Sequence, residues 1–171
     1  MAASDAAQLV VMGVSAVGKS TVAAALAERL DLPWVDADAL HPAENVAKMS
    51  AGTPLTDEDR WPWLDRVGEV LVDGAGTGVV VACSALRRAY RDRIRRVAPQ
   101  TRFVHLTGEE ALLQTRSQAR LGHFMPPSLL ASQLATLEDL GADEDGVVVT
   151  VDAPVGDIVE SVARWWETHD R

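Results

Sequence analysis

Eight residues near the N-terminus have the types and the spacing of a phosphate-binding loop. Residues 13–20 read GVSAVGKS and fit the pattern GxxxxGK[ST]. Backbone N–H groups can wrap a polyphosphate only where the chain turns tightly and no Cβ intrudes, which explains the two glycines. Lys19 is expected to reach the β- and γ-phosphates, and the Ser20 hydroxyl to ligate Mg²⁺. The motif predicts an ATP site made of Gly13, Val14, Ser15, Ala16, Val17, Gly18, Lys19, Ser20 and Thr21.

The elements around this loop are those that the motif requires. The apolar run 9–12 has the length of a strand, and apolar residues recur at helical spacing from Val22 to Leu30. A helix that begins at the loop directs its free N–H groups and the positive end of its dipole at the phosphates. A chance match would lack this context. The loop does not identify the phosphate acceptor, because kinases, ATPases and GTPases all use it.

Two aspartates follow the next apolar run, 32–35. In parallel α/β sheets ligands bind beyond the carboxyl ends of the strands, so Asp36 and Asp38 are expected beside the metal and the acceptor. We assign Asp36 to Mg²⁺, through water, and Asp38 to accepting or orienting the proton of the attacking hydroxyl. The alternative is that one of them caps the helix after Pro42. No acid ends the run 79–82, which shifts metal binding toward these aspartates.

Basic residues supply a second set of candidates. Arg60 either pairs with a neighbouring acid on the surface or binds a substrate carboxylate with its two-pronged guanidinium group. The arginine-rich stretch 87–96 is typical of a solvated, salt-bridged helix face, and only its first arginines would reach an anionic substrate. Segment 116–128 is basic and contains glycine and proline, which predicts a lid whose arginines reach the transferred phosphoryl group. An ordinary exposed loop is the alternative.

Composition narrows the class of protein. A length of 171 residues suits one domain, here 1–171, and no apolar run approaches the roughly 18 residues that span a membrane. The N-terminus has no export signal, so a cytoplasmic enzyme is expected. The single cysteine, Cys83, excludes an internal disulfide framework and is expected to be a core residue rather than a nucleophile. A net charge of −9 argues against a nucleic-acid partner.

The alternation of elements predicts the fold. Strands are expected at 9–12, 32–36, 79–82, 102–106 and 147–151, with helices between them, including one from 128 to 140 that Gly141 ends. This pattern predicts an α/β P-loop NTPase of the nucleoside monophosphate kinase type, with a five-stranded parallel sheet flanked by helices. The acceptor is expected to bind in a substrate-binding segment at about 40–72, and the lid lies at about 116–128.

Several segments are more specific than the phosphate loop. DADALHP at 36–42, GTPL at 52–55, DEDR at 57–60, CSAL at 83–86, GHF at 122–124 and GADE at 141–144 closely resemble the gluconokinase family. The resemblance runs from Val10 to about Pro154. It implies ATP-dependent phosphorylation of D-gluconate at its terminal hydroxyl, which gives 6-phosphogluconate for the pentose phosphate or Entner–Doudoroff route. It also implies a homodimer.

The resemblance completes the predicted site. Lys19, Asp38 and Arg120 are assigned to catalysis, with Arg116 behind Arg120. Arg60 is the residue best suited by its chemistry to the gluconate carboxylate. His41, Lys48 and Arg87 are further candidates for the hydroxyl groups and the carboxylate of gluconate, and they depend more on the resemblance. The full set of residues beside the loop and Arg60 is Asp38, His41, Lys48, Arg87 and His123 for the substrate, and Arg116, Arg120 and Pro154 for ATP.

The chain departs from the family pattern at three places. The family usually has small residues where Ala16 and Val17 stand, a glycine at Ala37, and a lysine at Leu121, so the lid has one cation fewer here. Two other functions remain open. One is a kinase of the same fold that acts on shikimate, a nucleoside monophosphate or another sugar acid. The other is a nucleotide-binding switch. The absence of the guanine-recognition motif NKxD argues against it.

Overall fold

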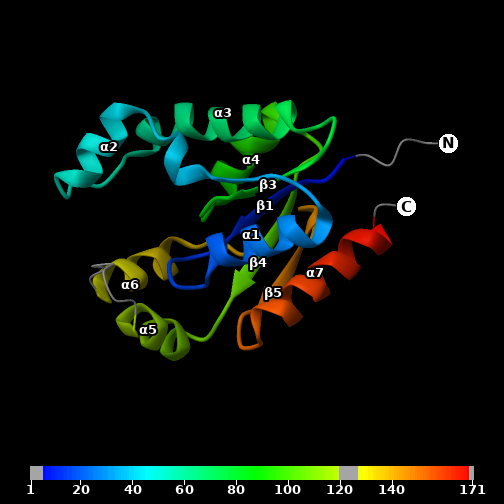
Figure 1. Cartoon of the computed structure of the whole chain (residues 1–171). Coiled ribbons are helices and arrows are strands. Elements are labelled where there is room, and N and C mark those ends of the chain that lie inside the picture. The colour runs from blue at the N-terminus through cyan, green and yellow to red at the C-terminus, as the bar shows by residue number, and fades with distance from the viewer. Residues whose placement is uncertain (1–5, 120–126, 170–171) are drawn as a thin grey trace.

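A computed structural model describes residues 6–119 and 127–169 of the chain. Five strands form one parallel sheet in the order β2-β3-β1-β4-β5 (Figure 1). This arrangement confirms the predicted five-stranded parallel sheet. The strands are β1 (Gln8–Met12), β2 (Trp34–Asp36), β3 (Val79–Ala82), β4 (Arg102–Thr107) and β5 (Gly146–Thr150).

Helices connect the strands and cover both faces of the sheet. Figure 1 shows α3 and α4 together on one side, and α1 with α7 on the other. The helices are α1 (Lys19–Leu30), the 3₁₀ helix η1 (Ala37–Leu40), α2 (Ala43–Ser50), α3 (Asp57–Asp73), α4 (Arg88–Val97), α5 (Glu110–Ala119), α6 (Pro127–Thr136) and α7 (Val155–His169). Within the described ranges, no helix has both the length and the apolar character needed to cross a membrane.

Strand β1 lies at the centre of the sheet and is buried along its whole length. Leu9 and Val11 pack toward α1 and α7, whereas Val10 and Met12 pack toward α3 and α4. A strand buried on both faces reads as an unbroken apolar run, which is why the sequence predicted it. Because all five strands are parallel, the loops that leave β1, β2 and β3 meet at one edge of the sheet.

The start of α3 is fixed by a reciprocal cap. The Thr56 hydroxyl accepts a hydrogen bond from the Asp59 N–H at 3.2 Å, and the Asp59 carboxylate accepts one from the Thr56 N–H at 2.9 Å. Two otherwise unpaired N–H groups of the first turn are satisfied in this way. The acids at 57–59 lie in this first turn, where the positive end of the helix dipole favours carboxylates.

The predicted helix from 128 to 140 is wrong at its C-terminal end. Helix α6 ends at Thr136, because the Glu138 N–H donates to the Leu86 carbonyl at 2.7 Å instead of to a carbonyl of the helix. Gly141 therefore does not cap it; its N–H donates to the Glu144 carboxylate at 2.8 Å. The apolar spacing of the leucines continues past the helix, but tertiary hydrogen bonds end it. Strand β5 also lies one residue earlier than predicted.

The arginine-rich helix α4 is salt-bridged as predicted, but it is not solvated throughout. Arg91 is fully buried and forms a two-pronged ion pair with Glu144, whose side chain is also buried. A residue inside a run of charges was expected at the surface. Arg91 is accommodated because its charge and all three of its guanidinium nitrogens find partners in the core.

Candidate active site

The phosphate loop connects β1 to α1, and its glycines stand where only glycine fits. Gly13 has φ +147°, and a Cβ there would lie 2.7 Å from the Leu106 carbonyl oxygen and 2.9 Å from a methyl group of Val17. Gly18 has φ +88° and is the N-cap of α1. The first turn of α1 contains no acidic residue, so no carboxylate opposes the positive end of its dipole. The loop is therefore shaped and charged for an anion.

Ala16 adopts the same left-handed region without being a glycine, at φ +69°. This conformation is strained by about 1 kcal/mol for a residue that carries a Cβ. The position is one of those where the chain departs from the family pattern. Ala16 is buried, at 7% exposure.

Polar groups within the loop are arranged around one peptide unit. The Lys19 ammonium donates to the Val14 carbonyl at 3.0 Å, and the Ser15 N–H donates to the side-chain oxygen of Gln133 at 2.6 Å. The Ser15 hydroxyl is buried and has no hydrogen-bond partner within the structure described. An orphaned buried hydroxyl is unusual in a folded protein, and one in a phosphate loop fits a phosphate oxygen as its partner.

Ser20 and Asp36 meet at the predicted metal position. The Ser20 hydroxyl donates to Asp36 Oδ2 at 3.0 Å, while Asp36 Oδ1 accepts from the Asp38 N–H at 3.0 Å and so caps η1. Asp36 is thus a helix cap, but the helix that it caps is η1 and not α2, whose N-cap is Pro42. Its role toward Mg²⁺ stays a prediction. The described residues contain no group of three or more His, Cys, Asp or Glu that could hold a metal. Mg²⁺ suits this site, because it binds through one or two oxygen ligands together with substrate phosphates and water.

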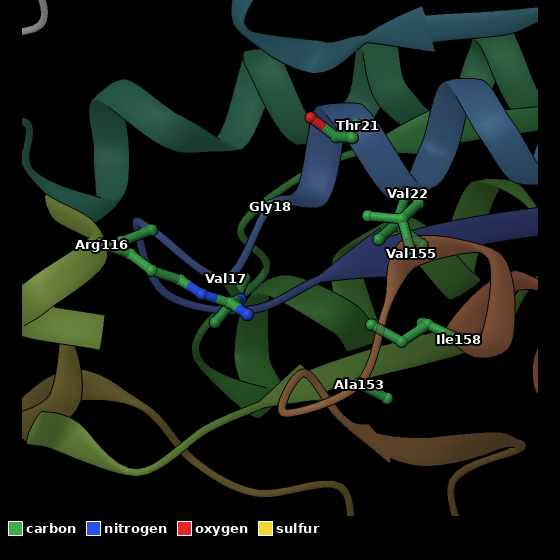
Figure 2. A pocket seen from close by; sticks show the side chains of 9 residues that line it. Val17, Gly18, Thr21, Val22, Arg116, Ala153, Val155 and Ile158 are labelled. Atoms are coloured by element: carbon green, nitrogen blue, oxygen red, sulfur yellow. The ribbon is translucent and has the colours of Figure 1, made fainter. Parts of the chain in front are cut away.

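A cavity of about 330 Å³ adjoins the loop on the side of α7. Arg116 lines it from α5, and Figure 2 shows its side chain extending toward Val17. The Arg116 guanidinium donates to the Val151 carbonyl at 2.7 Å. Pro154 lies in the sequence between Ala153 and Val155, which both line the cavity. The lining consists of Ala16, Val17, Gly18, Thr21, Val22, Arg116, Ala153, Val155 and Ile158.

Four side chains at the start of α3 and the start of α4 contact one another. We term them the acceptor cluster, after the substrate predicted to bind there: Asp57, Arg60, Arg87 and Tyr90. Asp57 accepts from the Tyr90 hydroxyl at 2.6 Å and from Arg87 at 2.9 Å, and its carboxylate lies 3.5 Å from the Arg60 guanidinium. The guanidinium carbons of Arg60 and Arg87 lie 5.3 and 5.7 Å from the centre of the Tyr90 ring. Burial and the Asp57 hydrogen bond raise the Tyr90 pKa, so the phenol stays protonated. Two cations are thereby held together on one aromatic ring.

His41 and Lys48 are each held by a second side chain. The His41 ring stacks on Trp63 with centroids 4.1 Å apart, and its Nδ1 lies 3.2 Å from the side-chain nitrogen of Asn45. Lys48 pairs with Asp59 at 2.7 Å, and this hydrogen bond lowers the Asp59 pKa to about 2.

Electrostatic interactions link Asp38 to His41 and link both Asp38 and Lys19 to Cys83. Burial lowers the His41 pKa, the nearby Asp38 charge opposes this shift, and the Arg60 charge adds to it. The imidazole is therefore neutral at pH 7. The charges of Asp38, Lys19 and Asp36 all act on the Cys83 thiol. Cys83 itself is buried, and burial raises its pKa to about 12, which confirms that it is a core residue.

The structure brings together most of the residues that the sequence singled out. Ser20 meets Asp36, His41 lies within the electrostatic reach of Asp38 and Arg60, and Arg60 meets Arg87. Arg120 and His123 lie outside the described residues, as does most of the predicted lid. Arg60 pairs with the neighbouring acid Asp57, as one of its two alternatives predicted, and its binding of a substrate carboxylate stays a prediction.

Three residues of the site were not singled out from the sequence. Asp57 lies in the segment at 57–60 that resembles gluconokinases, but its sequence context gives it no role in the site. Tyr90 stands at the spacing of a core residue within the arginine-rich stretch 87–96. No local sequence pattern predicts a role for Gln133, because its partner Ser15 is 118 residues away in the sequence.

Comparisons with known proteins show the family to which the chain belongs. A family model described as an AAA domain matches residues 9–140. The chain is 48% identical over 164 residues to a gluconokinase of Gluconobacter oxydans strain 621H, covering 95% of this chain and 92% of that protein. It is 41% identical over 155 residues to the thermoresistant gluconokinase of Escherichia coli K12, covering 89% of each. The chain belongs to the gluconokinase family.

A solved structure supports the gluconokinase fold. The crystal structure of a gluconokinase from Sinorhizobium meliloti 1021 is 50% identical in sequence, with a TM-score of 0.84 and coverage of 95% of this chain and 94% of that one. Membership of the gluconokinase family confirms the resemblance seen in the sequence, and it confirms the P-loop kinase fold with its nucleotide-binding loop.

Proposed function

We propose that this chain transfers the γ-phosphoryl group of ATP to the terminal hydroxyl of D-gluconate, which yields ADP and 6-phosphogluconate. The observation that carries the proposal is the position of Asp38. Its charge acts on both Cys83 at the end of β3 and His41, and Arg60 also acts on His41. The Asp38 N–H also donates to Asp36, which accepts from Ser20 beside the phosphate loop. These contacts support a carboxylate close to the phosphate loop and to Arg60. The substrate implied is an alcohol with an anionic group, as in the gluconokinase relatives.

The donor side follows from the loop. The loop amides and Lys19 would bind the β- and γ-phosphates, and the cavity beside Arg116 and Pro154 would take the nucleoside. Ser20 and Asp36 would hold Mg²⁺, with Asp36 binding it through water. The metal, when bound, supplies positive charge that neutralises the phosphates. Phosphoryl transfer has a loose transition state, so positioning and charge account for most of the catalysis.

The acceptor side uses the residues around η1 and α3. Asp38, whose side chain lies at the exposed start of η1, would accept or orient the proton of the attacking hydroxyl. Arg60 and Arg87 would bind the carboxylate of gluconate, because a guanidinium pairs with a carboxylate through two parallel hydrogen bonds. Neutral His41 and Lys48 would contact its hydroxyl groups. Asp57 keeps the two arginines in place when no substrate is bound.

Other elements of the proposal come from the sequence. Arg120, with Arg116 behind it, would stabilise charge on the transferred phosphoryl group, and His123 would contact the substrate. We also propose that residues 1–171 act as one domain, in a homodimer in the cytoplasm, with no nucleic-acid or membrane partner. The acidic net charge of −9 supports the part that concerns nucleic acids.

A substrate panel tests the proposal. ADP release is measured with gluconate, other aldonates, shikimate and nucleoside monophosphates, and kcat/KM is compared. We expect gluconate to be preferred by at least about tenfold, since the other acceptors differ from it in the anionic group, in the length of the chain to the hydroxyl or in the configuration of the hydroxyl groups. A preference for shikimate would show that the chain is a kinase of the same fold that acts on a different acceptor. Hydrolysis that no acceptor stimulates would indicate a nucleotide-binding switch instead.

A further inference from the structure

Gln133 reaches from α6 to the phosphate loop. Its side-chain oxygen accepts the Ser15 N–H hydrogen bond at 2.6 Å, although the two residues are 118 positions apart. Its neighbour Ser132 is exposed, whereas Gln133 is half-buried. The contact therefore joins α6 to the phosphate loop, two elements that are far apart in the sequence.

The contact acts on the same peptide unit as Lys19. The Ser15 N–H and the Val14 carbonyl belong to one peptide group, and that carbonyl accepts from the Lys19 ammonium at 3.0 Å. A trans peptide is planar, so its N–H and C=O point in opposite directions and turn together. By holding the N–H, Gln133 sets the direction of the carbonyl that orients Lys19. Hydrogen bonds at both ends of one peptide also strengthen each other.

The chain after Gln133 continues to the acceptor cluster. The Glu138 N–H donates to the Leu86 carbonyl at 2.7 Å, and the Glu138 carboxylate pairs with Arg87 at 3.4 Å. The end of α6 and the residues after it thus contact the donor loop at one point and the acceptor side at another. Gln133 is the contact on the donor side.

We propose that Gln133 is a positioning residue for the γ-phosphate end of ATP, acting on Lys19 through the peptide between Val14 and Ser15. The inference rests on the proposed function, because it takes ATP as the donor. In phosphate loops of this pattern the lysine reaches the β- and γ-phosphates. Loss of Gln133 should therefore weaken binding of ATP more than binding of ADP, which has no γ-phosphate.

Calorimetric titration of the full chain with MgATP and MgADP tests this role. In Gln133→Leu, which keeps the volume but removes the acceptor, we expect ATP affinity to fall about tenfold and ADP affinity about twofold or less. Ser132→Ala, on the same helix, is the control and should change neither. In a Lys19→Met background, Gln133→Leu should cause no further selective loss, because both residues act through one peptide. Equal losses for ATP and ADP, or a full effect in the Lys19→Met background, would overturn the proposal.

A second variant guards against a folding defect. If thermal unfolding shows that Gln133→Leu is destabilised, Gln133→Met removes the acceptor with an unbranched side chain that adapts more easily to its surroundings. It should still lower ATP affinity more than ADP affinity, and equal losses for the two nucleotides would refute the role. Neither titration uses gluconate. A wild-type chain that leaves gluconate unphosphorylated would therefore defeat the proposed function without altering the ATP-to-ADP result.

Discussion

The buried ion pair between Arg91 and Glu144 yields a prediction whose magnitude can be worked out. The Arg91 Nε lies 2.7 Å from one oxygen of Glu144, and Nη2 lies 3.0 Å from the other. The same guanidinium donates to the Ala85 carbonyl at 2.9 Å and to the Asp139 carbonyl at 3.2 Å. It thus joins the loop after β3 to the segment after α6. Glu144→Gln removes the negative charge and leaves Arg91 buried without a counterion.

Two estimates of the effect agree. Breaking a buried pair by removing one partner destabilises a protein by about 3–5 kcal/mol. Burial alone would raise the Glu144 pKa, but hydrogen bonds from Arg91, the Gly141 N–H and Arg95 lower it from 4.5 to about 2. A shift of that size corresponds to about 3 kcal/mol of stability. We expect Glu144→Gln to lower the free energy of unfolding at pH 7 by about 3 kcal/mol.

The pH dependence distinguishes the ion pair from simple packing. Because the folded-state pKa is lowered, the stabilisation is complete above the unfolded pKa of 4.5 and is lost as the pH falls toward 2. The difference in the free energy of unfolding between wild type and Glu144→Gln, measured by urea unfolding, should therefore decrease by about 2 kcal/mol from pH 7 to pH 3. Asp143→Asn is the control, since its partner Arg88 is exposed and the change should be much smaller. A difference that is absent at pH 7, or the same at both pH values, would refute the reasoning.

Three further variants test the site. Asp38→Asn should lower kcat by about 100-fold or more, the scale of a positioned base, while ATP affinity measured by titration stays nearly constant; undiminished turnover would remove Asp38 from the mechanism. Arg60→Lys should raise the KM for gluconate about tenfold, because an ammonium cannot bind a carboxylate with two parallel hydrogen bonds; steady-state kinetics in which only the KM for ATP rises would contradict that role. Ala16→Gly should raise the free energy of unfolding by up to about 1 kcal/mol, because φ at this position is +69°; a lower urea midpoint would show that the loop is not strained there.

The sequence predicted those parts of the molecule that depend on local pattern. The apolar run of β1 and the glycines of the loop depend on neighbouring residues, and the structure has them as expected. Asp36 and Asp38 could be placed because the end of a parallel strand is a known position for ligands. The pairing of Ser20 with Asp36 follows from that placement.

Other parts depend on contacts that no local pattern reveals. Helix α6 ends early because Glu138 bonds to Leu86, which lies on another loop. Arg91 was expected at the surface because it stands among charges, but Glu144 offers it a partner in the core 53 residues away. Gln133 was overlooked for the same reason. In each case the decisive partner is distant in the sequence.

The most direct test of the account is a crystal structure with a non-hydrolysable ATP analogue, Mg²⁺ and gluconate. We predict the analogue on the loop at 13–20, the terminal hydroxyl of gluconate within hydrogen-bonding distance of Asp38, and its carboxylate at Arg60. Gluconate bound away from Asp38, or with its carboxylate rather than its terminal hydroxyl toward the γ-phosphate, would contradict the account.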